Sequence, residues 1–373
     1  MQKKPPINFM NAGFLTLTPI GALILVPFYQ YVIGFNLYEW SLFAFYMIAT
    51  GLSITGGYHR LWSHKSYRAH WSVRLFYAIF GAAACQNSIL AWSCDHRSHH
   101  RFVDDHDKDP YSASRGFWFS HVGWVFRDYP RHITDNSNVQ DLMRDPIVVW
   151  QHKYYLPLAA LTNLVIPLLL GFAVGRPTGV LLLCFFLRVV LNHHFTFFIN
   201  SLAHIWGARP YSEESSARDN ALLAFLTYGE GYHNFHHTFQ HDFRNGVHWW
   251  HFDPSKWLIL MGSWMGLTRD LKQASKLQIE KARLKMQLQR ALLQAEKDAE
   301  AVRLRAALES AYGQFVTTLN EWSRVRKEWL ATRRAKVTQR LDLIEMRNRY
   351  LEIQYSLRLK RRQWRILLAA LSN

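Results

Sequence analysis

The sequence predicts an all-α integral membrane protein, with a four-helix transmembrane domain, a cytoplasmic helical domain and a C-terminal helical extension. Three observations predict this fold class. Four apolar stretches are long enough to cross a hydrocarbon core, which takes about 20 residues of helix. Fifteen tryptophans and seventeen tyrosines fit a protein with long membrane–water boundaries. The last part of the chain is rich in strong helix formers.

The four predicted spans form two helical hairpins. They cover residues 13–33, 37–57, 154–174 and 178–202. Only GFNL separates the first pair and only GRPT the second, so each hairpin has a very short outer turn. A further apolar stretch, residues 73–90, is short and ends in polar residues. We expect it to lie in the membrane plane or to re-enter the membrane, because it is too short for a fifth span.

The distribution of positive charge predicts the orientation. Twelve Lys/Arg residues lie between Gly57 and Tyr154, whereas the two outer turns hold only Arg176. The positive-inside rule therefore places the middle region and both termini in the cytoplasm, and we expect a bacterial inner membrane. The N-terminal apolar stretch is too long for a signal-peptide core, so we expect an uncleaved anchor.

The composition changes near residue 269, which predicts a domain of residues 1–268 and a tail of residues 269–373. The tail holds 24 Lys/Arg and 11 Asp/Glu, so it carries +13 of the net charge of +17. A coiled-coil-like face is predicted from apolar residues spaced three or four apart. It comprises Leu284, Leu288, Ala291, Ala295, Ala299, Val302 and Ala306. We expect a break near residues 312–314, followed by a second helical stretch that carries Trp322, Trp329, Leu341 and Ile344.

Several roles are open for this basic tail. It can be a solvated helical surface, or an amphipathic helix on anionic lipid. Self-association through a coiled coil and docking of an acidic electron-transfer protein are further possibilities. Nucleic-acid binding is not expected, because the chain also contains hydrophobic spans.

Three clusters stand out among the 19 histidines. They comprise His59 and His64 in HRLWSH, His96, His99 and His100 in HRSHH, and His233, His236 and His237 in HNFHH. In HxxHH the side chains at i, i+3 and i+4 share one helix face, so three imidazoles can converge on a metal. The alternative is that these are surface histidines of a basic domain. Three clusters on one side of the membrane make a metal site the better interpretation.

The number of donors indicates which metal site this is. Eight imidazole nitrogens are too many for one tetrahedral zinc ion and suit two metals with open positions. Imidazole suits iron, and a dinuclear site suits activation of O2. Ferritin-like sites use two Glu-x-x-His motifs and zinc peptidases use HExxH, and neither pattern occurs here.

HRLWSH, DHRSHH and GEGYHNFHH resemble the three histidine boxes of the membrane fatty acyl-CoA desaturases, the stearoyl-CoA (Δ9) desaturase family. The similarity extends through residues 54–64, 116–124 and 200–204 and covers about residues 10–270, so the tail lies outside it. By resemblance, His204 is a ninth metal ligand and Asn200 holds iron through a water molecule. The deeper His193 and His194 match no ligand position.

The resemblance implies an O2-dependent desaturase that introduces a cis double bond, at Δ9, into a fatty acyl-CoA or another acyl thioester. It implies two iron ions as cofactor and O2 as co-substrate. The electron donor is expected to be a separate protein of ferredoxin, cytochrome b5 or reductase type, because no such motif is fused to this chain. The positions that match substrate contacts are Asn87, Asp95 and Arg127.

Two departures from the family pattern concern the substrate head group. Cys94 stands where the animal enzymes have arginine, and Asp128 stands where they have lysine. Loss of two cations weakens binding of an anionic nucleotide, so an acyl carrier protein or an intact phospholipid remain alternative carriers of the acyl chain.

Two other functions remain open. A hydroxylase of the same histidine-rich superfamily would use the same ligands and return oxygen to the carbon. A protein of another class, a membrane scaffold with a helical interaction tail, would need no intact metal site.

Overall fold

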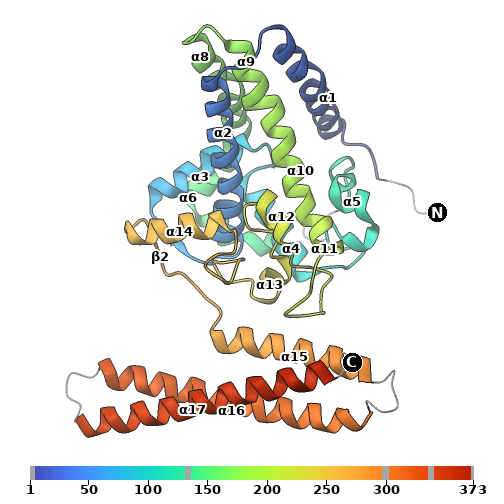
Figure 1. Cartoon of the computed structure of the whole chain (residues 1–373). Coiled ribbons are helices and arrows are strands. Elements are labelled where there is room, and N and C mark those ends of the chain that lie inside the picture. Colours follow the sequence, from blue (N-terminus) through green and yellow to red (C-terminus); the bar gives the residue numbers. More distant parts are fainter. Residues whose placement is uncertain (1–4, 131–135, 296–301, 335–339, 371–373) are drawn as a thin grey trace. The chain divides into compact units, whose positions relative to one another are not determined.

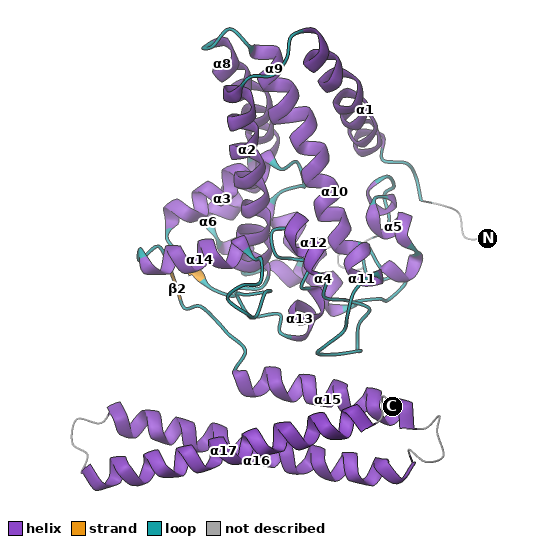
Figure 2. Cartoon of the chain, in the orientation of Figure 1, coloured by secondary structure: helices purple, strands orange, loops and turns teal. Residues whose placement is uncertain are grey.

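The computed structural model describes residues 5–130, 136–295, 302–334 and 340–370, which are mostly helical (Figures 1 and 2). The strands within these ranges are β1 (Arg68–Ala69) and β2 (Thr268–Arg269), which pair antiparallel. The chain forms two compact units. The membrane unit comprises Met1–Arg209 and Glu214–Gln273, and the tail unit comprises Pro210–Glu213 and Ala274–Asn373. The predicted fold class is confirmed.

Among the described residues, four helical segments of the membrane unit are long and apolar enough to cross a bilayer, as predicted. They are Phe9–Val32, Leu37–Ser63, Tyr155–Phe172 and Pro177–Ile205. The last three combine α-helical and π-helical stretches. These stretches are α2 (Leu37–Leu52) and η1 (Ser53–Ser63); α7 (Tyr155–Ala160), η6 (Leu161–Val165) and α8 (Ile166–Phe172); and α9 (Pro177–Leu181), η7 (Leu182–Leu187), α10 (Arg188–Asn200) and α11 (Leu202–Ile205). The first span is the continuous helix α1 (Phe9–Val32).

A buried carboxylate joins the outer turns of the two hairpins. The Glu39 side chain is fully buried and accepts a hydrogen bond of 2.7 Å from the backbone N–H of Asn36, which caps α2. The same carboxylate lies 3.0 Å from the guanidinium Nε of Arg176, in the turn of the second hairpin. The short turns are therefore fixed to each other by an ion pair.

A buried cation stabilises helix ends inside the span region. Arg188 is fully buried and donates to the carbonyl oxygens of Ala83 and Cys184 at 2.6 and 2.9 Å, and to the amide oxygen of Asn163. Ala83 is the last residue of α3 and Cys184 lies in η7, so both carbonyls are at places where α-helical hydrogen bonding is interrupted. Arg188 supplies the donors that these carbonyls need in an apolar environment.

The stretch predicted as one in-plane or re-entrant helix, residues 73–90, is instead two helices. The first is α3 (Trp71–Ala83), and α4 (Ile89–Arg101) begins after the N-cap Ser88, whose hydroxyl accepts from the Ala91 N–H. Cys85 and Asn87 have φ values of 56° and 81°, in the left-handed region, so the helix cannot continue through them. Sequence analysis missed this because only hydropathy was considered.

The rest of the membrane unit consists of short helices and turns below the spans. They are η2 (Ala113–Arg115), α5 (Phe117–His121), η3 (Gly123–Val125), η4 (Ser137–Val139), η5 (Leu142–Arg144), α6 (Pro146–Lys153), α12 (Ala221–Leu226), α13 (His233–Thr238) and α14 (Pro254–Trp264). Their apolar core includes Tyr58 of η1, Ile89 of α4, Val148 of α6 and Ile259 of α14, all fully buried. This core joins the cytoplasmic end of the second span to the helices that carry the histidine boxes.

The tail unit consists of the helices α15 (Lys276–Ala295), α16 (Val302–Arg334) and α17 (Arg340–Ala370). Leu284 of α15, Leu308 and Phe315 of α16, and Leu357 and Trp364 of α17 are buried in one apolar cluster. The tail is therefore a packed three-helix unit with a core of its own.

Two details of the predicted tail are wrong. Helix α16 runs without a break through residues 312–314, because a single helical Gly313 costs only about 1 kcal/mol. The predicted apolar face does not continue across the chain either. Ala291 and Ala295 are buried and Leu288 is half-buried, but Ala306 is exposed, because α15 and α16 are separate helices. Ala299 lies outside the described residues, as does the side chain of Val302.

We expect Arg188→Gln to destabilise the membrane unit. Glutamine is too short to reach all three acceptors, and each buried carbonyl left without a donor costs about 1–3 kcal/mol. The melting temperature of the purified protein in detergent should fall by several degrees. Arg144→Gln, at an exposed position, is the control. Equal melting temperatures for the two variants would contradict this role of Arg188.

Candidate metal centre

Nine histidines of the membrane unit gather into two groups. His59, His64, His96, His100 and His236 form group A, and His99, His204, His233 and His237 form group B. Within each group, one ring nitrogen per residue lies within 4.8 Å of the others. These are the nine histidines predicted from the sequence. The structure brings all of them together from η1, α4, α11 and α13.

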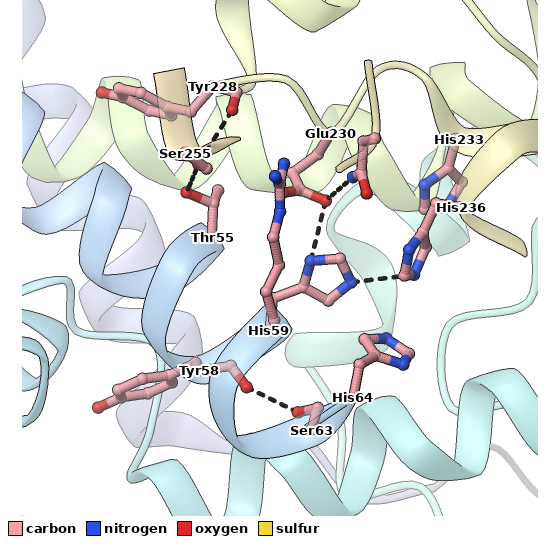
Figure 3. A network of polar contacts seen from close by, with 12 residues as sticks. Thr55, Tyr58, His59, Ser63, His64, Tyr228, Glu230, His233, His236 and Ser255 are labelled. Carbon is pink, nitrogen blue, oxygen red and sulfur yellow. Dashed lines mark hydrogen bonds and ion pairs between the residues drawn. The ribbon is translucent and has the colours of Figure 1, made fainter. Parts of the chain in front are cut away.

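A π-helix brings the two histidines of the first box together. In an α-helix, residues five apart differ by about 140° around the axis, so His59 and His64 would diverge. Here His59 lies on the π-helix η1 and His64 is its C-cap, and the His64 N–H donates to the His59 carbonyl oxygen at 3.0 Å, an i→i+5 bond. The ring centroids are therefore only 4.7 Å apart (Figure 3).

The two HxxHH boxes are shared between the groups. His96 and His100 point to group A and His99 to group B, whereas His233 and His237 point to group B and His236 to group A. The three imidazoles of one box therefore do not lie in the same group. Residues at i and i+4 differ by about 40° around a helix, but i+3 lies about 100° from i+4, so the i, i+4 pair stays together.

The Nε2 atoms face one another across each group. In group A, His236 Nε2 lies 3.0 Å from both His59 Nε2 and His100 Nε2. In group B, His233 Nε2 lies 3.2 Å from His204 Nε2 and 3.1 Å from His237 Nε2. A neutral imidazole nitrogen makes one hydrogen bond, as donor or as acceptor. Several lone pairs directed at one point fit a bound cation better than a hydrogen-bond network, so these residues are compatible with metal binding.

Acceptors outside the two groups hold several Nδ1 atoms. His59 Nδ1 lies 2.9 Å from Glu230 Oε2 (Figure 3), and His99 Nδ1 lies 2.9 Å from Asp109 Oδ1. His204 Nδ1 lies 2.7 Å from the Ser216 hydroxyl, which itself donates to Asp104. When Nδ1–H donates to an outer acceptor, the tautomer and ring orientation are fixed and Nε2 is free to bind a metal.

An arginine fixes the acceptor of His59. Arg60 is buried and its guanidinium lies 2.8 Å from Glu230 and 2.9 Å from Asp253, the N-cap of α14. Burial raises the pKa of Glu230, but Arg60 and His59 outweigh this effect and lower it to about 2. Glu230 is therefore a carboxylate, which ties the second span to the segment before the third box.

Burial also sets the protonation state of the imidazoles. Loss of water around the rings lowers the pKa well below its usual value, and the neighbouring imidazoles lower it further. This holds for His64, His96, His100, His233, His236 and His237. At neutral pH these rings are uncharged, which is the form that can donate a lone pair to a metal.

The other predicted site residues lie in several parts of the membrane unit. Asn200 is half-buried at the end of α10, four residues before His204. Asn87 is exposed before α4, Asp95 is half-buried within α4, and Arg127 donates to the Pro5 carbonyl oxygen at 2.6 Å.

Sequence analysis missed the residues that orient the rings: Glu230, Asp109, Ser216 and Arg60. Glu230 stood in the quoted GEGYHNFHH and Arg60 in HRLWSH, but neither was assigned a role. Asp109 follows the second box in an acidic segment, DDHDKD, which could have signalled carboxylates near the metal. Ser216 lies in an ordinary polar loop and left no signal.

The architecture and the histidine groups have a counterpart among known families. The family model described as fatty acid desaturase matches residues 39–260, more than half of the chain. The chain belongs to the fatty acid desaturase family. The resemblance noted in the histidine boxes is thereby confirmed. The tail unit, apart from Pro210–Glu213, lies outside the residues that the family model matches.

Named relatives match different shares of this chain. "Acyl-CoA desaturase 1" of Saccharomyces cerevisiae is 45% identical over 239 residues, which are 64% of this chain and 47% of the yeast protein. "Probable acyl-CoA desaturase" of Schizosaccharomyces pombe is 44% identical over 238 residues, 63% and 49% of the two chains. "Stearoyl-CoA desaturase 5" of Homo sapiens is 38% identical over 282 residues, 74% and 83%. The chain thus spans about half the length of the two fungal relatives.

We expect Asp109→Asn to weaken metal binding. The change keeps the size of the side chain but removes the charge that holds His99 Nδ1. Substitution of such outer partners typically costs 10–100-fold in metal affinity. The measurement is metal content by mass spectrometry after equilibration with graded chelator. Asp107→Asn, whose side chain is 88% exposed, is the control. Equal retention in both variants would show that Asp109 does not orient a ligand.

We also expect the metal-free protein to lose stability as the pH falls. The six buried imidazoles stay neutral in the fold but bind protons below about pH 6.5 when unfolded, so acid favours the unfolded chain. Each contributes up to about 1.4 kcal/mol per pH unit. Melting temperatures between pH 7 and pH 5 measure this effect. The slope should be shallower for His100→Gln and unchanged for His106→Gln, an exposed residue. A flat profile for the unsubstituted protein would contradict neutral burial.

Proposed function

We propose that this desaturase introduces a cis double bond at Δ9 into a fatty acyl-CoA or another acyl thioester, using O2 and two iron ions. The observation that carries the proposal is the pair of adjacent imidazole groups, with five and four rings, at the ends of the second and fourth spans. Groups A and B would each hold one iron ion, with Asn200 adding a water-mediated contact. We further propose that the site and both termini face the cytoplasm.

The names of the relatives support the substrate class. The yeast protein is named for acyl-CoA and the human protein for stearoyl-CoA. They match 64% and 74% of this chain. Neither name specifies an electron donor, and a ferredoxin, cytochrome b5 or reductase-type partner belongs to our proposal only.

The chain's own residues would prepare the site for the reaction. When bound, two iron ions supply the oxidising power that breaks an unactivated C–H bond, which no side chain can provide. Glu230 and Asp109 keep the Nδ1 proton of His59 and His99 in place, so that Nε2 stays directed inward. The burial of the rings excludes water, which keeps them neutral and protects the reaction from solvent.

A small cavity lies close to the spans that carry ligand histidines. It lies between the second and fourth spans and is lined by Thr50, Gly51, Ala84, Asn192, Phe195 and Tyr228, among others. A Cβ atom at Gly51 would lie 2.2 Å from the Tyr228 ring, so the glycine lets this ring approach the second span. The separation between the head-group site and the iron ions would then decide which carbons react.

The head-group site remains the least constrained part of the proposal. Asn87 lines an open surface pocket together with His152 and Lys153. Lys153 offers a cation that sequence analysis did not consider. Cys94 is buried, and Asp128 is an acid that accepts from the Asn8 amide at 2.8 Å. Neither position therefore offers a cation for an anionic nucleotide. We propose Asn87, Asp95 and Arg127 as contacts of CoA, with an acyl carrier protein or a phospholipid as the alternatives.

A hydroxylase would use the same imidazole groups, and only the product distinguishes the two reactions. Expression in a desaturase-deficient host should restore monounsaturated fatty acids with the double bond at Δ9, measured by gas chromatography and mass spectrometry. His99→Ala and His236→Ala should abolish the new product, because each removes a donor from one group. His106→Ala should keep it. A hydroxy fatty acid without new monoenes would contradict desaturation.

The scaffold alternative predicts a different result in the same experiment. The desaturase should purify with iron after expression in iron-replete medium, and the two histidine variants should still reach the membrane. Protein without any transition metal, together with an unchanged fatty acid profile, would favour a scaffold.

A further inference from the structure

Helix α17 of the tail unit carries an exposed apolar stripe. It comprises Leu341, Ile344, Leu351, Tyr355, Leu359 and Ile366, with side chains between 43% and 74% exposed. The opposite face of the same helix supplies Leu357 and Trp364 to the core of the tail unit. The stripe is therefore an apolar surface that the three-helix packing does not cover.

The spacing of the stripe follows the period of a straight helix. At 3.6 residues per turn its six members fall within an arc of about 80°. From Leu341 to Ile366 the stripe is about 37 Å long, at 1.5 Å per residue. A narrow line of this length is the form that an amphipathic helix presents to the surface of a bilayer.

Arginines without a carboxylate partner lie along the stripe. Arg347, Arg358 and Arg362 are exposed, and none forms an ion pair with another described residue. In contrast, Arg349 and Arg361 lie toward the other helices and pair with Glu328 and Glu280. The positive charge beside the stripe is therefore available to an external anion.

The net charge of the whole unit agrees with this local pattern. Residues 274–373 hold 22 Lys/Arg and 10 Asp/Glu, a balance of +12. The long aliphatic stems of arginine can lie along an apolar surface while their charged ends reach anionic head groups. Basic residues beside a membrane are attracted to anionic lipid.

We propose that the stripe on α17 is a docking surface for a bilayer that contains anionic lipid. The membrane unit anchors the chain in such a bilayer, so docking is intramolecular and gains from a high effective concentration. The proposal is independent of the desaturation reaction, because no residue of α17 belongs to the histidine groups.

A second copy of the chain fits this surface less well. Arg362 lies within the arc of the stripe, so a parallel pair of α17 helices would place it against the same arginine of the other copy. In an antiparallel pair the flank that carries Arg347 and Arg358 would face its own counterpart. Like charges that face each other are destabilising. In the parallel pair this applies to Arg362 alone, because Glu345 and Glu352, exposed on the other flank of the stripe, would face Arg347 and Arg358.

The test uses the full-length protein with one copy in each lipid nanodisc, so that pairing is excluded. Tyr355→Cys carries an environment-sensitive thiol probe on the stripe, and Ser310→Cys, exposed on α16, carries it elsewhere. Cys94 and Cys184 are buried and Cys85 is half-buried, which favours reaction at the introduced thiol. We measure probe emission and iodide quenching in neutral lipid and in lipid that contains an anionic component.

With anionic lipid we expect a blue shift and several-fold weaker quenching at position 355, and no change at position 310. Combining Arg347→Gln, Arg358→Gln and Arg362→Gln should remove most of this protection. The matched control is Lys285→Gln with Lys327→Gln and Arg334→Gln, which removes the same charge elsewhere. This control should retain the protection at position 355. Leu351→Gln with Leu359→Gln should also abolish it.

Three results would overturn the proposal. The first is full iodide quenching of the probe at position 355 in anionic lipid. The second is equal protection in neutral lipid, which would remove the role of the arginines. The third is protection that appears only when two copies share a nanodisc, which would identify a second chain as the occupant. Helical content measured by circular dichroism shows whether each variant keeps its fold.

Discussion

The convergence of nine imidazoles into two groups is the constraint on which the membrane unit depends. Each ring loses its water and faces other rings, so each needs a fixed tautomer and a fixed direction. The chain meets this need with acceptors behind the rings, Glu230 and Asp109 foremost. These acceptors come from distant segments of the chain. The second span, helix α4 and the third box must therefore all be in place before either group is complete.

The spans themselves are adapted to this task. The second span ends as a π-helix, which directs His59 and His64 to one point, and Arg60 on the same turn holds the carboxylate behind His59. Interrupted helices leave carbonyl oxygens without donors in an apolar environment. Arg188 satisfies two of these carbonyls, so a buried charge serves helix packing near the cavity between the spans.

The tail unit differs from the membrane unit in its core and in its surface. Its core is apolar and its surface is basic, and apart from Pro210–Glu213 it lies outside the residues that the family model matches. One helix of the unit exposes an apolar stripe on the side away from that core. A chain anchored by four spans keeps such a surface close to lipid, so a weak affinity for a bilayer suffices for docking.

The sequence by itself determined the four spans, the helical tail and the nine histidines. These features depend on hydropathy over about 20 residues, on composition and on short motifs, all of which are local. It did not determine how the histidines divide. The i, i+4 pairs, the π-helical turn and the crossing of each HxxHH box between two groups follow from helix rotation and from long-range packing. Glu230, Asp109 and Ser216 become partners of the rings only when distant segments meet, and no local pattern encodes that meeting.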